Sequence, residues 1–393
     1  MDLARRFLDW KDSGSQPEAD PGAPVPPAGF GPRITPHGRA LTRTLTLERN
    51  PQWLIRHPLK DLVLIGGGEV RSASWEHALI LDLETTGLGG AGTLPFLAGV
   101  AAYEPDEWRA TQYFLAEPSD EAALLSALGE HLRSQTVLIT YNGKAFDWHL
   151  LLSRFIQNRL NPPPSPQAHV DILHLVRRLY RDCLTRCSLA VAEEGLLGFG
   201  RKGDVPSSEI PALYFSYLAS GDSHLLEPVL EHNLQDLEST LLIAGRILRG
   251  IGREEGPGED PEAWARLWRE RGRPERARTI LERICRENPA SEPRGYRARM
   301  DLGFLLKSLG RFESMARLFT QALENPDPLR GITPRIELAK HLEHRRKDFR
   351  GALDLTEECL AIARRRESLI GRAVDVEPIL HRRHRLLRRL GSS

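Results

Sequence analysis

The sequence predicts an α/β domain with a mixed sheet flanked by helices, followed by an all-α domain of repeated helix pairs. Between residues 76 and 250, β-branched and leucine-rich runs come first and then alternate with segments of helical periodicity. This order is typical of a mixed sheet with helices on both faces. After residue 261 the periodicity is helical throughout, and three segments share one pattern.

The bulk composition is that of a globular protein with two domains and tails. Its 393 residues are 40% apolar and 27% charged, which is ample for buried cores. The net charge of +1 excludes a global basic field, so nucleic acid would have to bind through a local patch. No apolar run approaches a membrane span, and the N-terminus has no signal-peptide stretch. We therefore expect a cytoplasmic protein without membrane contact.

The four cysteines do not indicate a zinc site. Cys183 and Cys187 are close in sequence, but no second pair completes a zinc-binding spacing. With Cys285 and Cys359 they are expected to be reduced thiols of a cytoplasmic protein.

Composition shifts divide the chain into five segments. The first is rich in Pro, Gly, Ser and Asp and reads as flexible, and the fourth is a charged linker rich in Gly and Pro. The boundaries are residues 1–38 (flexible), 39–75 (an N-terminal extension of the sheet domain), 76–250 (the sheet domain), 251–261 (the linker) and 262–393 (repeats with a basic tail).

Each expected element follows from its local pattern. Strands are expected where apolar runs are short, and helices where apolar residues recur at three and four positions. The expected strands are 39–48, 78–84, 93–103, 110–118, 136–142 and 169–173. The expected helices are 121–134, 146–160, 188–198, 224–250 with a split near Pro228, and one that follows residue 173 through Arg181.

The repeated segments are 264–289, 298–326 and 336–363. Aligned on Gly272, Gly310 and Lys347, each has a turn between two helices, with periods of 38 and 37 residues. A small close-packing position falls on Ala277 and Ala352, and on Met315 in the second segment. The pattern resembles tetratricopeptide repeats, which stack into a solenoid with a protein-binding surface. An irregular helical bundle is the alternative.

Asp82 and Glu84 form an acid pair on one face of an expected buried strand, because side chains at i and i+2 point the same way. Two carboxylates there repel each other and are costly to desolvate, and a cation relieves both problems. The strand ends at once in Thr85-Thr86-Gly87, and sites commonly form where a strand meets a loop. A lone acid pair is more often solvated surface, but this strand is too apolar for that.

Three further residues extend the constellation. Asp147 follows the strand end and glycine turn of YNGKAFD, in the first turn of the next helix. His232 and Asp236 are four residues apart in LEHNLQDLEST and share a helix face. Taken singly, the first is a good helix N-terminal residue and the second is a surface pair.

In combination, these segments resemble the DEDD exonuclease superfamily at all three of its motifs. The resemblance implies a ribonuclease H-like fold and 3′→5′ hydrolysis of phosphodiester bonds. It also implies that Asp82, Glu84, Asp147 and Asp236 hold two divalent ions, Mg²⁺ or Mn²⁺, for which hard oxygen ligands are suited. In such sites the ions lie roughly 3.5–4 Å apart and assist the attacking water and the departing 3′-oxygen.

The same resemblance implies that His232 is the general base. In the superfamily's histidine subclass the base precedes the last Asp by five residues, and in the tyrosine subclass by four. Here the spacing to Asp236 is four, but the residue is histidine. Four residues keep the two side chains nearly stacked on a helix, so the base would approach from the tyrosine-subclass direction.

A closer resemblance is to the YprB-like ribonuclease H-like family of bacteria. It is carried by LDLETTGLGGAGTLPFLAGV, QYFL, YNGKAFDWHLL, CSLAVAEEGLLG, IPALYFSYLASGD and LEHNLQDLEST, which together span residues 78–246. The preceding His37-Gly38 and the trailing repeats also fit the family's layout. This family is assigned nuclease function largely by motif, so the resemblance implies no particular substrate.

Five residues near the site are candidates for substrate binding. Thr85, Thr86 and Gly87 could contact the terminal nucleotide, or form a mere strand-ending turn. Asn142 could orient a phosphate or cap its turn, and Lys144 could bind a phosphate or be an ordinary exposed lysine. Of their neighbours, we expect Asp171 to cap a helix, and Trp148 either to stack on a base or to be buried.

Three functions remain open from the sequence. The first is an exonuclease on single-stranded DNA or RNA 3′ ends, the second a non-catalytic nucleic-acid-binding or scaffold protein acting through the repeats, and the third an endonuclease. The acid pair together with the helical H-x-x-x-D favours the first. A protein partner is expected for the repeats. The basic tail, residues 364–393, either contacts nucleic acid or forms a solvated face.

Overall fold

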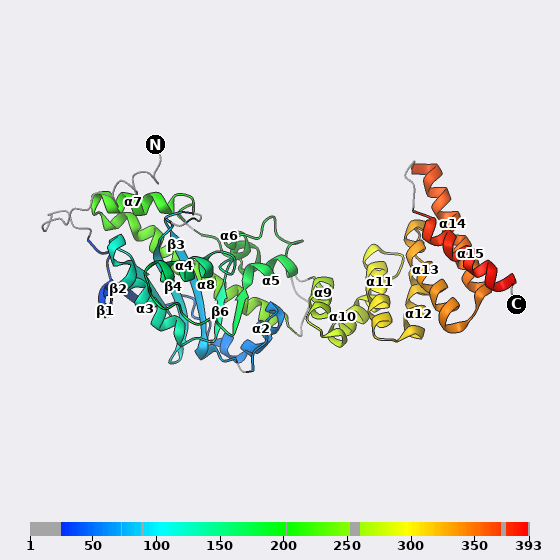
Figure 1. Ribbon diagram of the computed structural model, residues 1–393, viewed down its shortest axis with the longest axis horizontal. Coiled ribbons are helices and arrows are strands. Elements are labelled where there is room, and N and C mark those ends of the chain that lie inside the picture. The colour runs from blue at the N-terminus through cyan, green and yellow to red at the C-terminus, as the bar shows by residue number, and fades with distance from the viewer. Residues whose placement is uncertain are drawn as a thin grey trace. The chain divides into compact units, whose positions relative to one another are not determined.

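The computed structural model describes residues 25–71, 73–87, 90, 92–201, 203–251, 260–370 and 375–391 (Figure 1). The chain divides into two compact units, Met1–Ile251 and Gly252–Ser393. Residues 1–24 and 252–259, which the sequence assigns to the flexible segment and the linker, lie outside the described part. The finer boundaries drawn from the sequence remain predictions.

Unit 1 is built on a seven-stranded mixed sheet with the order β1-β2-β5-β4-β3-β6-β7. The strands are β1 (Gly31–Thr35), β2 (Gly38–Thr46), β3 (Ala78–Thr85), β4 (Pro95–Glu104), β5 (Glu107–Phe114), β6 (Val137–Thr140) and β7 (Ala168–Asp171). β3 pairs antiparallel with β4 and parallel with β6, and β6 pairs parallel with β7. The remaining pairs are antiparallel. The predicted mixed sheet is therefore confirmed.

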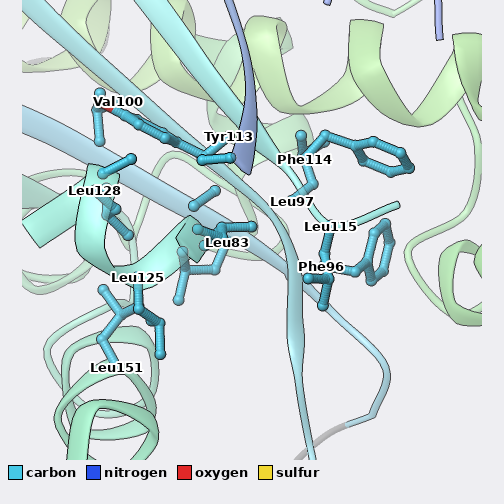
Figure 2. Close-up of a cluster of buried hydrophobic side chains, with 14 of the residues drawn as sticks. Leu83, Phe96, Leu97, Val100, Tyr113, Phe114, Leu115, Leu125, Leu128 and Leu151 are labelled. Carbon is cyan, nitrogen blue, oxygen red and sulfur yellow. The ribbon is translucent and has the colours of Figure 1, made fainter. Parts of the chain in front are cut away.

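β3 separates the core of unit 1 from the candidate site. Its leucines point to one side and pack with α3 (Glu121–Arg133) and α4 (Asp147–Gln157), where Leu83 lies in one buried cluster with Leu125 and Leu151 (Figure 2). Asp82 and Glu84 alternate with these leucines and point to the other side. There α8 (Glu227–Gly250) packs along β3 and β4.

The other helices of unit 1 surround this arrangement. They are α2 (Leu59–Gly66), α5 (Ile172–Leu179), α6 (Leu189–Ala192) with a π-helical turn Glu193–Leu197, and α7 (Ile210–Ser220). Short 3-10 turns occur at Gln52–Arg56, Trp75–His77, Pro118–Asp120 and Ser223–Leu226. The last of these precedes α8, so the long helix is split just before Pro228, as predicted.

The N-terminal boundary of the sheet was predicted incorrectly. Residues 31–35 form β1, paired with β2, although the sequence assigns them to a flexible segment. The Gly-Pro pair at Gly31 and Pro32 suggested a loop, but β1 lies at the edge of the sheet. An edge strand tolerates a proline because one side of it needs no donor. Helices α2 and α7 were also not anticipated.

Unit 2 is helical throughout its described residues, 260–370 and 375–391. Its helices are α9 (Pro261–Glu270), α10 (Pro274–Glu287), α11 (Pro293–Ser308), α12 (Phe312–Ala322), α13 (Ile332–His341), α14 (Phe349–Ile370) and α15 (Glu377–Gly391). A 3-10 turn, Pro328–Gly331, and a π-helical turn, Leu342–Arg346, precede and follow α13. The predicted all-α region is confirmed. No described helix in either unit has the length and apolarity needed to cross a bilayer.

The three aligned segments of unit 2 share a turn conformation. Gly272 and Gly310 have φ of 67° and 73°, and Lys347 has φ of 59° although it is not glycine. Each stands between the two helices of its pair, which explains why glycine is favoured there. The expected close-packing residues are buried in all three pairs: Ala277, Met315 and Ala352.

Candidate active site

Asp82 and Glu84 lie near the end of β3, just before a register shift between Glu84 and Thr85. The Asp82 carboxylate accepts a hydrogen bond from Asn233 Nδ2 at 2.8 Å. Glu84 is 8% exposed, and its Oε1 atom lies 3.9 Å from His232 Nε2. Both acids therefore face α8, as the two-residue spacing predicts.

Asp147 is the first residue of α4 and is 8% exposed. The turn before it needs a glycine, because a Cβ on Gly143 would lie 2.7 Å from both Asp147 Oδ2 and Thr140 Cβ. Within the described residues, no hydrogen bond is made to the Asp147 carboxylate. A buried carboxylate of this kind is costly unless a cation compensates it.

His232 and Asp236 lie one turn apart on α8. His232 Nε2 is 3.6 Å from Asp236 Oδ2, and the ring is 6% exposed. On the other side of the ring, Nδ1 is 2.6 Å from Asp204 Oδ1. Because a carboxylate accepts, Nδ1 donates its hydrogen to Asp204, and Nε2 faces Glu84 and Asp236.

Arg201 is a site residue that the sequence did not reveal. Its guanidinium is 7% exposed and forms ion pairs with Asp236, with Glu193 at 2.5 Å and with Asp204 at 3.2 Å. Arg201 and Asp204 lie in the loop between the π-helical turn and α7, where neither periodicity nor motif spacing identifies a functional side chain. A charged pair inside a glycine-flanked loop, FGRKGD, was the available signal.

The four acids act on one another electrostatically. Burial raises the pKa of Asp82 well above its usual range, and Asp236 and Asp147 raise it further. The pKa of Glu84 is also raised well above its usual range. Burial is the largest cause, followed by the charges of Asp82 and Asp236. Burial and the neighbouring Asp171 and Asp236 raise the pKa of Asp147 to about 7. Carboxylates from β3, α4 and α8 thus come together as an acidic cluster.

Arg201 offsets part of this negative charge. Burial also raises the pKa of Asp236, while Arg201 and His232 oppose that rise. Burial alone would lower the pKa of Arg201, but the hydrogen bond to Glu193 and the charge of Asp236 raise it. Arg201 therefore stays charged and stands among the acids as a cation of the protein itself.

The donor set fits hard divalent cations, although the side chains are not arranged around one. Within the described ranges, no three His, Cys, Asp or Glu side chains stand together closely enough to hold an ion as they are placed. The cluster is nevertheless rich in buried carboxylate oxygens with few hydrogen-bond donors, the chemistry that Mg²⁺ and Mn²⁺ prefer. Arg201 binds one oxygen of Asp236, Oδ1, while Oδ2 faces His232 at 3.6 Å.

The hydroxyls of Thr85 and Thr86 bind backbone groups of the segment that joins β3 to β4. Thr85 Oγ1 donates to the carbonyl of Gly87 at 2.7 Å. Thr86 Oγ1 accepts from the backbone N–H of Leu94 at 2.9 Å. These bonds give both threonines a role in shaping the strand exit, and nucleotide contact by the turn remains a prediction.

Asp171 organises the second loop of the site. It caps α5 by accepting from Leu173 N at 3.1 Å, as predicted, and it also accepts from the backbone N–H groups of Asn142 at 2.9 Å and Lys144 at 3.2 Å. Asn142 has φ of 69°, so this turn is held in a left-handed conformation. The side chains of Asn142 and Lys144 are exposed, while Trp148 is buried in the core.

Comparison with known proteins identifies the family. Residues 79–248 match the RNase_H superfamily, a span that contains all five residues of the predicted catalytic set. The chain is also 34% identical over 287 residues to the uncharacterized protein YprB of Bacillus subtilis (strain 168), across 72% of this chain and 68% of YprB. The chain belongs to the YprB-like family of the ribonuclease H superfamily.

Membership of the YprB-like family gives the fold and a broad class of chemistry. A ribonuclease H-like domain indicates nuclease-type activity on nucleic acid, and such nucleases typically use divalent metal ions. The predicted ribonuclease H-like family is thereby confirmed. The DEDD exonuclease subclass and the tetratricopeptide likeness stay predictions.

Proposed function

We propose that unit 1 is a metal-dependent 3′→5′ exonuclease that hydrolyses phosphodiester bonds at single-stranded DNA or RNA ends. The observation that carries the proposal is the cluster of Asp82, Glu84, Asp147 and Asp236 beside His232, in which Glu84 and Asp147 are buried and Asp82 and Asp236 half-buried. These four carboxylates would hold two Mg²⁺ or Mn²⁺ ions. When bound, the ions supply a lowered pKa for the attacking water and charge neutralisation at the leaving oxygen.

His232 supplies the base in this proposal. Asp204 accepts the Nδ1 proton at 2.6 Å, which fixes the tautomer and the ring orientation. Nε2 then faces the acidic cluster and can take a proton from water held there. Because the ring is bound on its far side, little reorganisation is needed when the proton arrives.

The two turns beside the cluster would hold the terminal nucleotide. Backbone and hydroxyl groups of residues 85–87 follow the acid pair directly, and the exposed Asn142 and Lys144 lie in the turn that precedes Asp147. Lys144 is suited to a phosphate as a point charge. Contacts of this kind recognise the backbone and tolerate any base, so they leave DNA and RNA both possible.

A ladder experiment tests the proposal. Linear DNA and RNA oligonucleotides labelled at the 5′ end, and circular single strands, are incubated with the full chain and Mn²⁺. A 3′→5′ exonuclease shortens the linear strands stepwise and leaves circles intact. Cutting of circles would indicate an endonuclease. No hydrolysis of any substrate would favour the alternative, a non-catalytic nucleic-acid-binding or scaffold protein acting through unit 2.

For unit 2 we propose a tetratricopeptide-like stack that binds a protein segment. The repeated left-handed turn at Gly272, Gly310 and Lys347 supports it, as does the buried residue five positions later in each pair, which is alanine in two pairs and methionine in one. Helix pairs of this size have little core alone and gain stability by stacking. Affinity capture of protein partners by the wild-type chain tests this, with a variant that carries charge reversals on α9, α11 and α13 as the control. Equal capture of partners by the wild type and the variant would contradict the proposal.

A further inference from the structure

A chain of hydrogen bonds runs from the half-buried Arg43 through the interior of unit 1 and ends on Asp82. Arg43 Nε of β2 donates to Gln112 Oε1 of β5 at 2.7 Å. Gln112 Nε2 donates to Asn233 Oδ1 at 2.8 Å and to the carbonyl of Leu230 at 2.9 Å. Asn233 Nδ2 of α8 then donates to Asp82 Oδ2 at 2.8 Å. Gln112 and Asn233 are both fully buried.

This chain has a fixed direction. A guanidinium can only donate, so Arg43 requires the oxygen of Gln112 to face it. Both amide hydrogens of Gln112 then point toward acceptors, one of them the Asn233 oxygen. Asn233 is left with its NH₂ group toward Asp82. The orientation of a side-chain amide is inferred from its hydrogen-bond partners. Here Arg43 sets the orientation of Gln112, and Gln112 sets that of Asn233.

Gly99 provides the space that the Asn233 amide occupies. Gly99 of β4 is the register partner of Asp82 on β3. A Cβ on Gly99 would overlap the Asn233 side-chain oxygen and lie 2.8 Å from its Cγ and Nδ2 atoms. Gly99 is not among the positive-φ residues, so it is needed for space rather than for backbone conformation.

We propose that Asn233 is a positioning residue for Asp82 and that Arg43 and Gln112 set its orientation. The inference rests on the proposed function, since it treats Asp82 as a metal ligand. A donor on Oδ2 holds the carboxylate in one rotamer and favours its ionised form.

The decisive variant is Gln112→Glu in the full-length chain. A carboxylate at this position still accepts from Arg43 but has no hydrogen for the Asn233 oxygen. The Asn233 amide then turns its NH₂ toward the new carboxylate and presents its oxygen to Asp82. We expect Mn²⁺ affinity, measured by calorimetry without substrate, to fall about tenfold or more, as for other groups that orient ligands.

The matched control is Gln157→Glu, because Gln157 is exposed and also accepts from an arginine, Arg154, at 2.5 Å. Its Mn²⁺ affinity should equal that of wild type. If Gln112→Glu does not fold, the variants Arg43→Met and Arg43→Lys test the relay instead. The methionine variant loses the donor that sets the direction and should lose affinity, while the lysine variant keeps a donor and should retain it.

The outcomes distinguish a failure of this inference from a failure of the proposed nuclease function. Mn²⁺ binding by wild type, weakened in Gln112→Glu or Arg43→Met and kept in the controls, supports the relay. Folded Gln112→Glu protein that binds Mn²⁺ within about twofold of wild type overturns the relay and leaves the nuclease proposal intact. Wild-type protein that binds no Mn²⁺ overturns both.

Discussion

Arg201 places a guanidinium where the acidic cluster needs positive charge. It forms ion pairs with Asp236, Glu193 and Asp204 while almost completely out of water. A buried charge pair of this kind is strongly destabilising when one partner is removed. Arg201 therefore explains how four neighbouring carboxylates can coexist in a folded protein before any ion arrives.

Asp82→Asn tests the charge balance of the cluster. The substitution removes one negative charge but keeps an oxygen that can accept from Asn233. We expect the metal-free protein to be at least as stable as wild type toward urea, because repulsion from Asp236 and Asp147 is relieved. Stabilisation by Mn²⁺ should disappear. The exposed Asp182→Asn variant is the control, and a variant still stabilised by Mn²⁺ would contradict Asp82 as a ligand.

His232→Ala tests the base. Hydrolysis should slow by about 10²–10⁴-fold, the usual contribution of a positioned base. Asp204→Asn should slow it less, by about tenfold, because the ring remains but loses the partner that orients it. The control is His224→Ala, whose side chain is 83% exposed. Single-turnover rates on a labelled oligonucleotide measure all three, and full activity in His232→Ala would remove the histidine from the mechanism.

Motif spacing identified some residues of the candidate site and missed others for a physical reason. Asp82, Glu84, Asp147, His232 and Asp236 stand on regular elements, whose periodicity fixes the direction of each side chain. Arg201 and Asp204 stand on a loop, and Gln112 and Asn233 reach the site through contacts between distant segments. Sequence periodicity holds no information on such contacts.

At the scale of elements, α15 illustrates how a charge run can be structural. Its sequence is strongly basic, which left contact with nucleic acid and a solvated face as alternatives. In the structure Arg382 and Arg385 bind the buried Glu343, and Arg383 binds Glu357 at 3.1 Å. Arg389 also lies over the Phe349 ring, 5.2 Å from its centroid. These contacts pack α15 against α14 and the π-helical turn, a role that was not anticipated from the sequence.

Glu343→Gln tests this docking and its pH dependence. Burial alone would raise the pKa of Glu343, but the hydrogen bond from Arg385 and the charge of Arg382 hold it below its usual value. Because the pKa of Glu343 is lower in the folded state, ionised Glu343 stabilises the fold at pH values above its unfolded pKa of about 4.3. This stabilisation is lost as the pH falls through the folded pKa. At pH 7 we expect the variant to lose about 2–3 kcal/mol, less than a fully buried pair because Arg385 is partly exposed.

The comparison that decides is the difference between variant and wild type in urea unfolding at two pH values. This difference should be large at pH 7 and shrink in acid, where Glu343 becomes protonated in both states. The control is Glu358→Gln, because Glu358 pairs with Arg335 but is 54% exposed. Equal losses in the two variants, or a loss independent of pH, would refute a docking role for the buried pair.

Where an element was predicted from the sequence, its type was predicted well, but some helices and strands were missed altogether. β3 and α8 were predicted because their apolar patterns are long and regular. β1 was missed because Gly31 and Pro32 resemble a loop, and only pairing with β2 makes a strand of it. α7 was missed because its residues are apolar on most sides, and a helix without a polar face shows little periodicity.

At the scale of the molecule, the division into two compact units predicts two unfolding transitions. Ligand binding stabilises the folded state that holds it, by about 2.7 kcal/mol at a hundredfold excess over Kd. Mn²⁺ should therefore raise the transition of unit 1 by roughly 5–10 °C for a unit of this size. The transition of unit 2 should stay in place.

Variants assign the two transitions in a calorimetric scan. Asp82→Asn should abolish the shift with Mn²⁺, and Glu343→Gln should lower the transition that Mn²⁺ leaves unchanged. A single transition that both substitutions move together would show that the units unfold as one. The order of an α/β domain and an all-α domain was readable from the sequence because each has its own periodicity. The cooperativity between them was not, since it depends on contacts and not on local pattern.

The most direct measurement of the central claim is anomalous diffraction from crystals of the chain grown or soaked with Mn²⁺. Manganese peaks are expected between the carboxylates of Asp82, Glu84, Asp147 and Asp236. Crystals of Asp82→Asn protein should show the peaks weakened or lost. Manganese absent from this cluster at saturating concentration would contradict the account.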